Sequence, residues 1–559
     1  MGTSSTRRLL LTVGLLLAAT ACTSVRSRPE PGPGEATRPV PPVPPPKRDA
    51  RIAPEEPGAK GAEVLESRDF VVTFVKAGDT VERLAARYLG DPRKAWMIED
   101  YTGARTFSQG QEVVIPKREW NPVGVFPWGY QLVPVLVYHN VSPQQKGRLS
   151  IAARDFEAQM RHLHGEGFRA VSLRDFLEFT AGRRQLPRKS VLLAFDDGYR
   201  SFMRYARPLL RELGFSATLF VYTDFIGAGG NALSWQELRA LIDEGFDVQA
   251  HSKTHKYLRR QEGESEAEYA RRMEAELAYP LALFRKHLGR ASETLAYPYG
   301  DADGELLQYV VQHGYVAAFT VRRQANPAFV LPLKMNRSQI YAEMTLQEFA
   351  KNLTVFQDEN LGVARTPGWK PSAFSDPALP QFVSPVAAAP LPASPRERLA
   401  ALHNERSELL EQRDRLRQAL EERVIALTIN PREPRAQEAL KRLEGRISRE
   451  VADLLLEGRE LMGRGLPGEA RQRFLAALSL DPTNRTAFET LQNQVREVAS
   501  IAHTVRPGDT LASLAELYYG NPFHAEVIAE TNQLPANARL AAGRTLQIPE
   551  IPGVPFLPH

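Results

Sequence analysis

Two adjacent carboxylates follow a short apolar run, in a position that suits hydrolytic chemistry. The run from Val191 to Phe195 has the length and apolarity of a buried parallel strand, and Asp196 and Asp197 come directly after it. Gly198 then permits a tight turn. In α/β folds the carboxyl ends of parallel strands collect catalytic side chains. The pair therefore predicts one metal ligand beside one proton acceptor, although Asp-Asp-Gly is also an ordinary turn sequence.

Two histidines farther along supply the nitrogen ligands that such a site needs. His251 and His255 follow a second predicted strand, which begins at Phe246. Imidazoles at this spacing can face one ion, and two histidines with one carboxylate are a usual ligand set for catalytic Zn²⁺ or a similar divalent ion. A third apolar run ends in a Pro-aromatic-Gly turn at residues 295–300. Each motif alone has an ordinary structural explanation, whereas the three together favour a catalytic site.

The order of these motifs resembles that of the NodB-type polysaccharide deacetylases, carbohydrate esterase family 4. The resemblance covers roughly residues 130–360 and rests on Phe-Asp-Asp-Gly, His-Ser-x-x-His and Tyr-Pro-Tyr-Gly. It implies that Asp196 is the general base and that Asp197, His251 and His255 hold one divalent metal ion, for which we expect Zn²⁺.

The third motif has one departure from the family pattern. The resemblance implies that the segment at Pro298 and Tyr299 stabilises the oxyanion through a backbone amide and lines the substrate groove with its aromatic ring. The family commonly has an arginine two residues before that proline, where it orients the base, and this chain has Ala296. Arg337, which follows another predicted strand, is the candidate that replaces it.

The general acid is predicted at a strand end that precedes the acid pair. Residues 133–138 form an apolar run that ends at His139, and no Leu-x-His stretch lies between Tyr299 and the end of the predicted domain at residue 362. This order resembles circularly permuted deacetylases, including those acting on poly-N-acetylglucosamine, in which the acid-donating histidine comes first. His139 is therefore the candidate acid, with a structural role as the alternative. His313, at the end of a predicted surface helix, is interpreted as structural.

These assignments predict hydrolysis of an acetamide. A divalent ion lowers the pKa of its bound water to about 7 and polarises the carbonyl, while Asp196 takes the water's proton. The ion and a backbone amide stabilise the tetrahedral oxyanion. His139 protonates the departing amine, so the products are acetate and a free amino sugar.

The beginning of the chain predicts export. Arg7 and Arg8 precede an apolar stretch from residue 9 to 17, and small residues precede Cys22, the only cysteine of the chain. Residues 1–22 therefore resemble a bacterial lipoprotein signal with lipidation at Cys22, and simple signal cleavage is the alternative. We expect an exported cell-envelope lipoprotein on the periplasm-facing membrane, attached to the bilayer only through Cys22 and without an intramolecular disulfide.

Length and charge bound the domain organisation. The 559 residues are too many for one core, and several of the 42 prolines must lie in linkers. The net charge of +5 fits an anionic wall or membrane surface, and the absence of a concentrated basic run in the sequence argues against nucleic acid as a partner.

An internal repeat flanks the central region. Residues 69–117 and 502–550 share a Gly-Asp-Thr turn, a Gly-x-Pro step and a closing apolar run, and both resemble LysM modules that bind N-acetylglucosamine chains. We expect sugar contacts from the backbone around residues 78–80 and 508–510, and we interpret Asp79 and Asp509 as helix caps.

The remaining segments complete a multidomain α/β architecture. In chain order we predict a Pro-rich linker at 23–68, a NodB-like incomplete (β/α) barrel with a mainly parallel sheet at 125–362, a Pro/Ala linker at 363–395, and an all-α segment at 396–500. That last segment resembles one tetratricopeptide (TPR) repeat at positions Gly458, Ala470, Phe474, Ala477 and Pro482. It is predicted to contact a protein partner or to act only as a spacer.

Three functions remain open on the sequence alone. The leading hypothesis is deacetylation of peptidoglycan, favoured by the flanking repeats. The second is deacetylation of an exported or capsular poly-N-acetylglucosamine, favoured by the early position of His139. The third is a non-catalytic wall-binding scaffold, which the missing arginine at Ala296 keeps open.

Overall fold

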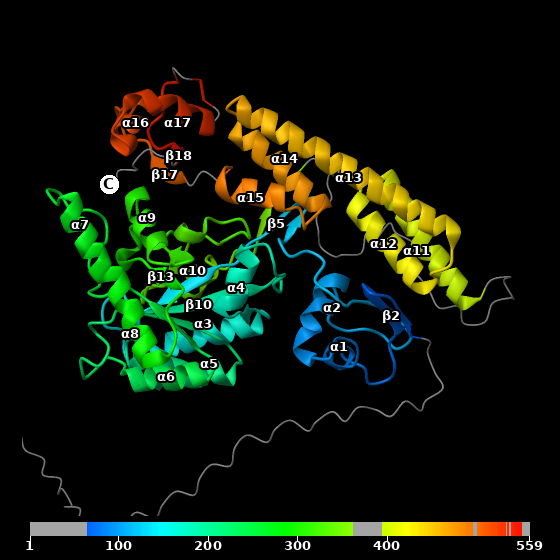
Figure 1. Cartoon of the computed structure of the whole chain (residues 1–559), viewed down its shortest axis with the longest axis horizontal. Coiled ribbons are helices and arrows are strands. Elements are labelled where there is room, and N and C mark those ends of the chain that lie inside the picture. Colours follow the sequence, from blue (N-terminus) through cyan, green and yellow to red (C-terminus); the bar gives the residue numbers. More distant parts are fainter. Residues whose placement is uncertain (1–63, 362–393, 496–499, 533, 536–537, 550–559) are drawn as a thin grey trace, which may run out of the picture. The chain divides into compact units, whose positions relative to one another are not determined.

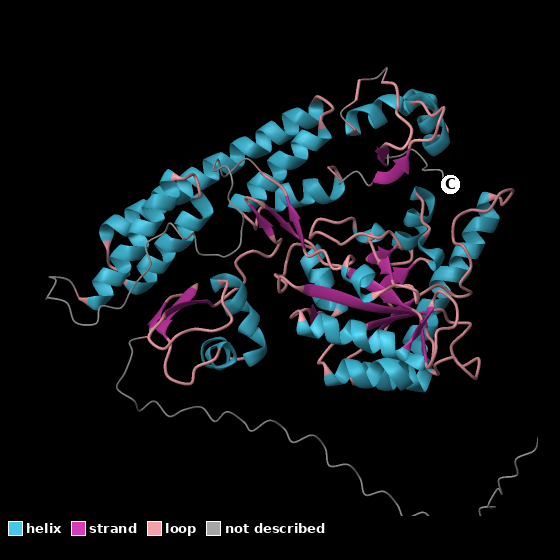
Figure 2. Ribbon diagram, turned by 180° about the vertical axis from the view of Figure 1, so that it is seen from behind, coloured by secondary structure: helices cyan, strands magenta, loops and turns pink. Residues whose placement is uncertain are grey.

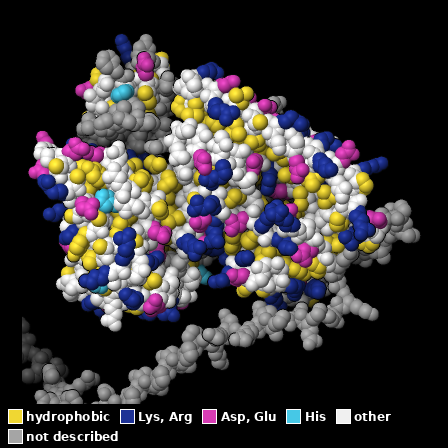
Figure 3. All heavy atoms as spheres, viewed as in Figure 1, with side chains coloured by type: hydrophobic (Ala, Val, Ile, Leu, Met, Phe, Trp, Pro, Cys, Tyr) yellow, Lys and Arg dark blue, Asp and Glu magenta, His cyan; other side chains and the backbone are white. Residues whose placement is uncertain are grey.

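The computed structural model describes residues 64–361, 394–495, 500–532, 534–535 and 538–549. The predicted signal at 1–22 with Cys22 lies outside the described residues, as do nearly all of the linkers predicted at 23–68 and 363–395. Within the described ranges, no helix combines the length and the apolarity that crossing a membrane requires. Acidic and basic side chains are interspersed on the face that Figure 3 shows.

The central domain is built on an eight-stranded sheet in which every strand pairing is parallel. The strands run in the order β14-β13-β12-β11-β10-β6-β15, and β9 also pairs with β10. The bounds are β6 (Val135–Tyr138), β9 (Arg169–Ala170), β10 (Ser190–Asp197), β11 (Thr218–Val221), β12 (Asp247–Ala250), β13 (Thr294–Ala296), β14 (Ala317–Phe319) and β15 (Ser338–Gln339). This open parallel sheet confirms the predicted fold class of the domain.

Strand β10, in the middle of the sheet, is buried on both faces. All eight of its residues are buried, and successive side chains point to opposite faces. Leu193 and Phe195 pack into one apolar cluster, whereas Leu192 and Ala194 pack into another on the opposite face. An uninterrupted apolar run is therefore the pattern that this position requires.

Helices alternate with the strands and surround them, as Figures 1 and 2 show. Their apolar faces complete the core; α6, for example, begins with a capping box of Ser234 and Glu237 and buries Leu238 and Leu241. The helices are α3 (Ala153–Gly165), α4 (Leu173–Thr180), α5 (Arg207–Glu212), α6 (Trp235–Asp243), α7 (Glu266–Met273), α8 (Tyr279–Leu288), α9 (Gly304–Gln312) and α10 (Leu346–Ala350). Short outer strands are β4 (Val125–Phe126), β5 (Gly129–Gln131), β7 (Asn140–Ser142), β8 (Ser150–Ala152) and β16 (Phe356–Asp358).

The two repeats share a strand, helix, helix, strand order. The first has β1 (Leu65–Glu66), β2 (Phe70–Phe74), α1 (Val81–Leu89), α2 (Ala95–Thr102) and β3 (Glu112–Pro116); the second has β17 (Ser500–Thr504), α16 (Leu511–Tyr519), α17 (Ala525–Thr531) and β18 (Thr545–Pro549). One antiparallel strand pair closes each repeat: β2 pairs with β3 in the first repeat, and β17 pairs with β18 in the second.

The predicted helix caps of the repeats are wrong by one residue. Thr80 and Thr510 are the N-caps, and their hydroxyls accept hydrogen bonds from backbone N–H groups of α1 and α16. Asp79 instead accepts a hydrogen bond from the backbone N–H of Lys76, and Asp509 accepts one from Arg506. Each aspartate therefore closes the turn before the helix, because its carboxylate reaches back along the chain.

The helical segment comprises α11 (Pro395–Gln412), α12 (Leu416–Ile429), α13 (Pro434–Gly463), α14 (Pro467–Leu480) and α15 (Arg485–Asn493). Helices α13 and α14 pack closely at Gly458, since a Cβ atom placed there would lie 2.7 Å from the ring of Phe474. Ala470 and Ala477, which flank Phe474 in the sequence, are fully buried. The TPR-like assignment of the segment stays a prediction.

Alanine substitutions at two glycines of α13 should change the stability of the helix pair in opposite directions. Gly458→Ala forces a methyl group into the Phe474 ring and is expected to destabilise the helix pair by about 1 to 3 kcal/mol. Gly445→Ala meets only the end of Arg449, at 3.7 Å, and is expected to stabilise α13 by about 0.5 to 1 kcal/mol. Hydrogen exchange of α13 and α14 peptides measures both, and equal protection in the two variants would contradict this packing.

Candidate metal centre and active site

The predicted site residues lie at the carboxyl ends of neighbouring strands. His139 follows β6, Asp196 and Asp197 end β10, His251 follows β12, and the segment containing Tyr299 follows β13. Strands β6, β10, β11, β12 and β13 are consecutive neighbours in the parallel sheet. Because all of them point the same way, their carboxyl ends share one edge.

Three side chains converge on one point at this edge. Ligand atoms of Asp197, His251 and His255 all lie within 4.8 Å of one another. Oδ1 of Asp197 is 3.3 Å from Nε2 of His255 and 3.8 Å from Nε2 of His251. That same Oδ1 is buried and has no hydrogen-bond partner among the described residues. A buried carboxylate oxygen of this kind is costly unless a cation satisfies it, so these residues fit a divalent metal ion.

A backbone contact sets the direction of His251. Its Nδ1 lies 2.7 Å from the carbonyl oxygen of Ala296, and this contact requires Nδ1 to carry the proton and donate it. Nε2 is then unprotonated and turned toward Asp197, as a metal-binding imidazole requires. Burial lowers the pKa of His251 to about 3, which keeps the ring neutral.

The two adjacent aspartates experience opposite electrostatic environments. Burial, with the neighbouring charge of Asp196, raises the pKa of Asp197 to about 7. Burial also favours protonated Asp196, but the charge and the hydrogen bond of Arg337 outweigh it, so the pKa of Asp196 lies below its usual value. Arg337 thus keeps Asp196 ionised at neutral pH, whereas a cation beside Asp197 would favour its ionised form.

Arg337 lies against the predicted base. It is fully buried, its Nη1 donates a hydrogen bond of 2.7 Å to Oδ1 of Asp196, and its Nε donates one of 2.9 Å to the carbonyl of Thr320. Arg337 directly precedes β15, so the expectation that it follows a strand is wrong. The contact nevertheless occurs because β15 pairs with β6, which pairs with β10.

The backbone is strained at the site. Among the described residues, the non-glycine positions with positive φ are Asp197 (73°), Ser252 (71°), His255 (59°), Tyr299 (61°) and Asp414 (58°), and all but Asp414 belong to the three motifs. The left-handed region is unfavourable for residues with a Cβ atom, and such strain gathers where side chains must be aimed. The hydroxyl of Ser252 accepts a hydrogen bond from the N–H of His255, 3.0 Å away, and supports this turn.

The remaining predicted residues occupy different settings. His139 is half-buried, burial lowers its pKa, and its Nδ1 has no hydrogen-bond partner among the described residues. Pro298 is buried, whereas Tyr299 is 52% exposed and its ring centroid lies 4.9 Å from that of His255. His313 ends α9 and contacts Glu274, as expected of a structural histidine.

Two tyrosines that contact His255 or Tyr299, namely Tyr222 and Tyr257, were not predicted from the sequence. Tyr222 follows β11, and its ring centroid lies 5.2 Å from that of His255. Its position at the carboxyl end of a strand in the same sheet was the available signal. Tyr257 stacks on Tyr299 and carried no such signal, because it lies in a loop.

The Arg337 contact yields a test. Arg337→Lys keeps the charge but loses the planar fork that joins Asp196 to Thr320, so acetate release should fall about 100-fold. Arg337→Gln leaves a buried carboxylate without its partner and should also destabilise the domain by about 3 to 5 kcal/mol. The exposed Arg323→Gln is the matched control, and equal activity in all three variants would exclude an orienting role for Arg337.

Comparison with known proteins identifies two domains. Residues 183–318 match the polysaccharide deacetylase family, and residues 503–549 match the LysM domain. The matched range 183–318 contains both aspartates of the acid pair, both histidines of the second motif, and Tyr299. His139 and Arg337 lie outside this range. The LysM prediction is thereby confirmed for the second repeat, and for residues 69–117 it stays a prediction.

Individual relatives share about a quarter of the aligned residues. The protein named "Putative polysaccharide deacetylase YxkH" of Bacillus subtilis (strain 168) is 25% identical over 188 residues, which are 34% of this chain and 64% of that protein. Poly-beta-1,6-N-acetyl-D-glucosamine N-deacetylase of Escherichia coli (strain K12) is 23% identical over 271 residues, 42% of this chain and 40% of the relative. The structure of Streptococcus pyogenes deacetylase PplD in complex with acetate is 21% identical, with a TM-score of 0.37 over 40% of this chain and 99% of that one. The chain thus spans less than two thirds of the length of the first two relatives.

Proposed function

We propose that this chain removes acetyl groups from a polymer of N-acetylglucosamine in the bacterial cell envelope, by metal-dependent hydrolysis. The observation that carries the proposal is the convergence of Asp197, His251 and His255 to within 4.8 Å, beside an Asp196 that Arg337 holds. The match to the polysaccharide deacetylase family supports the same chemistry.

Each residue of the site has a proposed task. Asp197, His251 and His255 would hold a divalent ion, for which Zn²⁺ is proposed, and such an ion lowers the pKa of water to about 7 and polarises an acetamide carbonyl. Asp196, kept ionised by Arg337, accepts a proton from the attacking water.

The remaining residues complete the reaction. The backbone amide at Tyr299 donates a hydrogen bond to the oxyanion that forms from the carbonyl oxygen. His139 donates a proton to the amide nitrogen as the C–N bond breaks, so acetate and a free amine leave.

Two polymers are proposed as substrates. Poly-N-acetylglucosamine is supported by the name of the Escherichia coli relative, and by His139 preceding the acid pair. Peptidoglycan, the leading hypothesis from the sequence, also contains N-acetylglucosamine, and the LysM domain supports binding to either. Lipidation at Cys22, a periplasm-facing location and a protein partner for the helical segment remain further proposals.

Chelation is the first test of the reaction. Dialysis against a chelator should abolish acetate release from poly-N-acetylglucosamine or from sacculi, and added Zn²⁺ should restore it. Asp196→Asn should lower release by about 100-fold or more, because it removes the proton acceptor. Its metal content, measured by mass spectrometry, should equal that of the wild type.

The outcomes separate an enzyme from a scaffold. Acetate release that persists without metal would contradict the mechanism. Wild-type protein that sediments with sacculi but releases no acetate from either polymer, with any divalent metal, would show a non-catalytic scaffold.

The role of His139 can be tested with two leaving groups. An amine leaves only with a proton, whereas 4-nitrophenolate leaves without one. His139→Ala should therefore lower deacetylation of the polymer by about 100-fold or more and lower hydrolysis of 4-nitrophenyl acetate far less. Equal losses on both substrates would show that His139 is structural.

A further inference from the structure

Aromatic contacts connect His255, one of the candidate metal ligands, with three tyrosines. The ring of His255 neighbours those of Tyr222, at 5.2 Å, and Tyr299, at 4.9 Å, and the ring of Tyr257 stacks on that of Tyr299. The centroids of Tyr257 and Tyr299 are 4.2 Å apart and their planes are inclined by 22°. Tyr257 has no role in the proposed reaction, and it is absent from every motif considered above.

The two outer rings remain open to solvent. Tyr257 is 53% exposed and Tyr299 is 52% exposed, although stacked aromatic rings usually gain stability by burial. The face of a β-linked pyranose carries C–H groups and is apolar, while its hydroxyls project from the ring edge. Aromatic side chains with a few polar neighbours are the usual lining of such binding sites.

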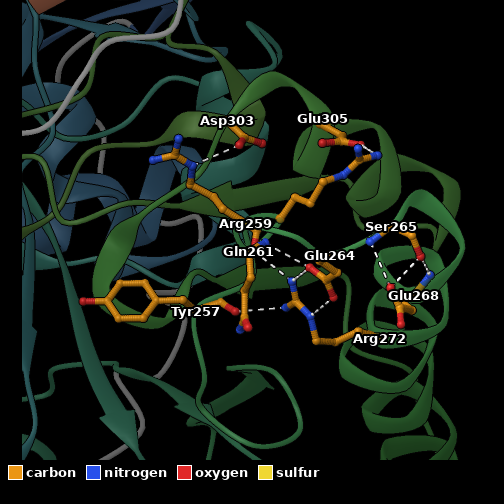
Figure 4. Close-up of polar contacts among 10 residues, drawn as sticks. Tyr257, Arg259, Gln261, Glu264, Ser265, Glu268, Arg272, Asp303 and Glu305 are labelled. Carbon is orange, nitrogen blue, oxygen red and sulfur yellow. Dashed lines mark hydrogen bonds and ion pairs between the residues drawn. The ribbon is translucent and has the colours of Figure 1, made fainter.

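The loop that carries Tyr257 is held firmly by one arginine. Arg272 of α7 donates hydrogen bonds to the carbonyl oxygens of Tyr257, at 3.0 Å, and Arg259, at 2.8 Å. It also pairs with both carboxylate oxygens of Glu264, each at 2.7 Å, and this hydrogen bonding lowers the pKa of Glu264 to about 2. Figure 4 shows these contacts, with the Tyr257 ring pointing away from them.

A second arginine joins this loop to the turn that carries Tyr299. Nε of Arg259 donates to Asp303 at 2.9 Å, and its Nη1 donates to Asp301 at 3.3 Å. Asp303 is itself fixed as the N-cap of α9, and the turn η4 (Pro298–Gly300) ends immediately before Asp301. The two rings therefore belong to cross-linked segments, and their stacked arrangement costs little ordering when a ligand binds.

We propose that Tyr257 and Tyr299 form a preorganised stacking platform for a pyranose ring of the polymer, next to the sugar whose acetamide reaches the metal cluster. Tyr257 is then a specificity residue that favours chains over single sugars. The inference rests on the proposed deacetylase function and adds to it a second sugar subsite with a named anchor.

The test compares a sugar chain with a substrate that lacks sugar. We would measure kcat/KM for a β-1,6-linked N-acetylglucosamine pentamer and for 4-nitrophenyl acetate, and take the ratio of the two. Tyr257→Ala should lower this ratio about tenfold, chiefly through a higher KM for the pentamer, since a lost aromatic stack is a loss of binding. Tyr257→Phe keeps the ring and should restore most of the ratio.

Matched variants make the result decisive. Tyr279→Ala removes another exposed tyrosine, 47% exposed at the start of α8, and should leave the ratio unchanged. Arg272→Gln keeps Tyr257 but removes the anchor of its loop, and should lower the ratio. A Tyr257→Ala ratio equal to that of the wild type would overturn the inference, and an unchanged Arg272→Gln ratio would overturn the preorganisation. Wild-type protein inactive on both substrates would instead refute the proposed function.

Discussion

The parallel pairing of β6, β10, β11, β12 and β13 is the constraint on which the candidate site depends. Because these strands share a direction, residues that are far apart in the sequence, from His139 to Tyr299, reach one edge of the sheet. Close packing of β10 against an apolar cluster on each face holds this central strand in place. The functional residues can therefore sit in strained turns at the strand ends while the strands themselves stay rigid.

The same strand end holds two carboxylates in different chemical states. Arg337 compensates the charge of Asp196, so that carboxylate is ready to accept a proton. Asp197 has its Oδ1 buried without a hydrogen-bond partner among the described residues and faces two imidazoles, so its charge needs a cation. One dipeptide can therefore supply a base and a ligand, because the neighbours of each side chain differ.

Local patterns predicted the strand ends and the convergence of Asp197, His251 and His255, because a strand and a polar turn lie within a few residues of each other. Long-range contacts were harder. Arg337 reaches Asp196 through the pairing of β15 with β6, and its own local sequence indicates neither the pairing nor the burial. Tyr257 depends on hydrogen bonds from Arg272, which lies on another element. The predicted helix caps, Asp79 and Asp509, lie one residue before the observed caps, Thr80 and Thr510. Aspartate and threonine are both good N-cap residues, and only the local geometry distinguishes them.

The central claim is that Asp197, His251 and His255 share one divalent ion, and calorimetric titration of metal-free protein with Zn²⁺ tests it most directly. The described residues contain one group of this kind, so we expect one Zn²⁺ site per chain in the wild type. In a His251→Ala, His255→Ala double variant with an unchanged circular dichroism spectrum, that site should disappear. A double variant that binds Zn²⁺ with the stoichiometry and affinity of the wild type would contradict the account.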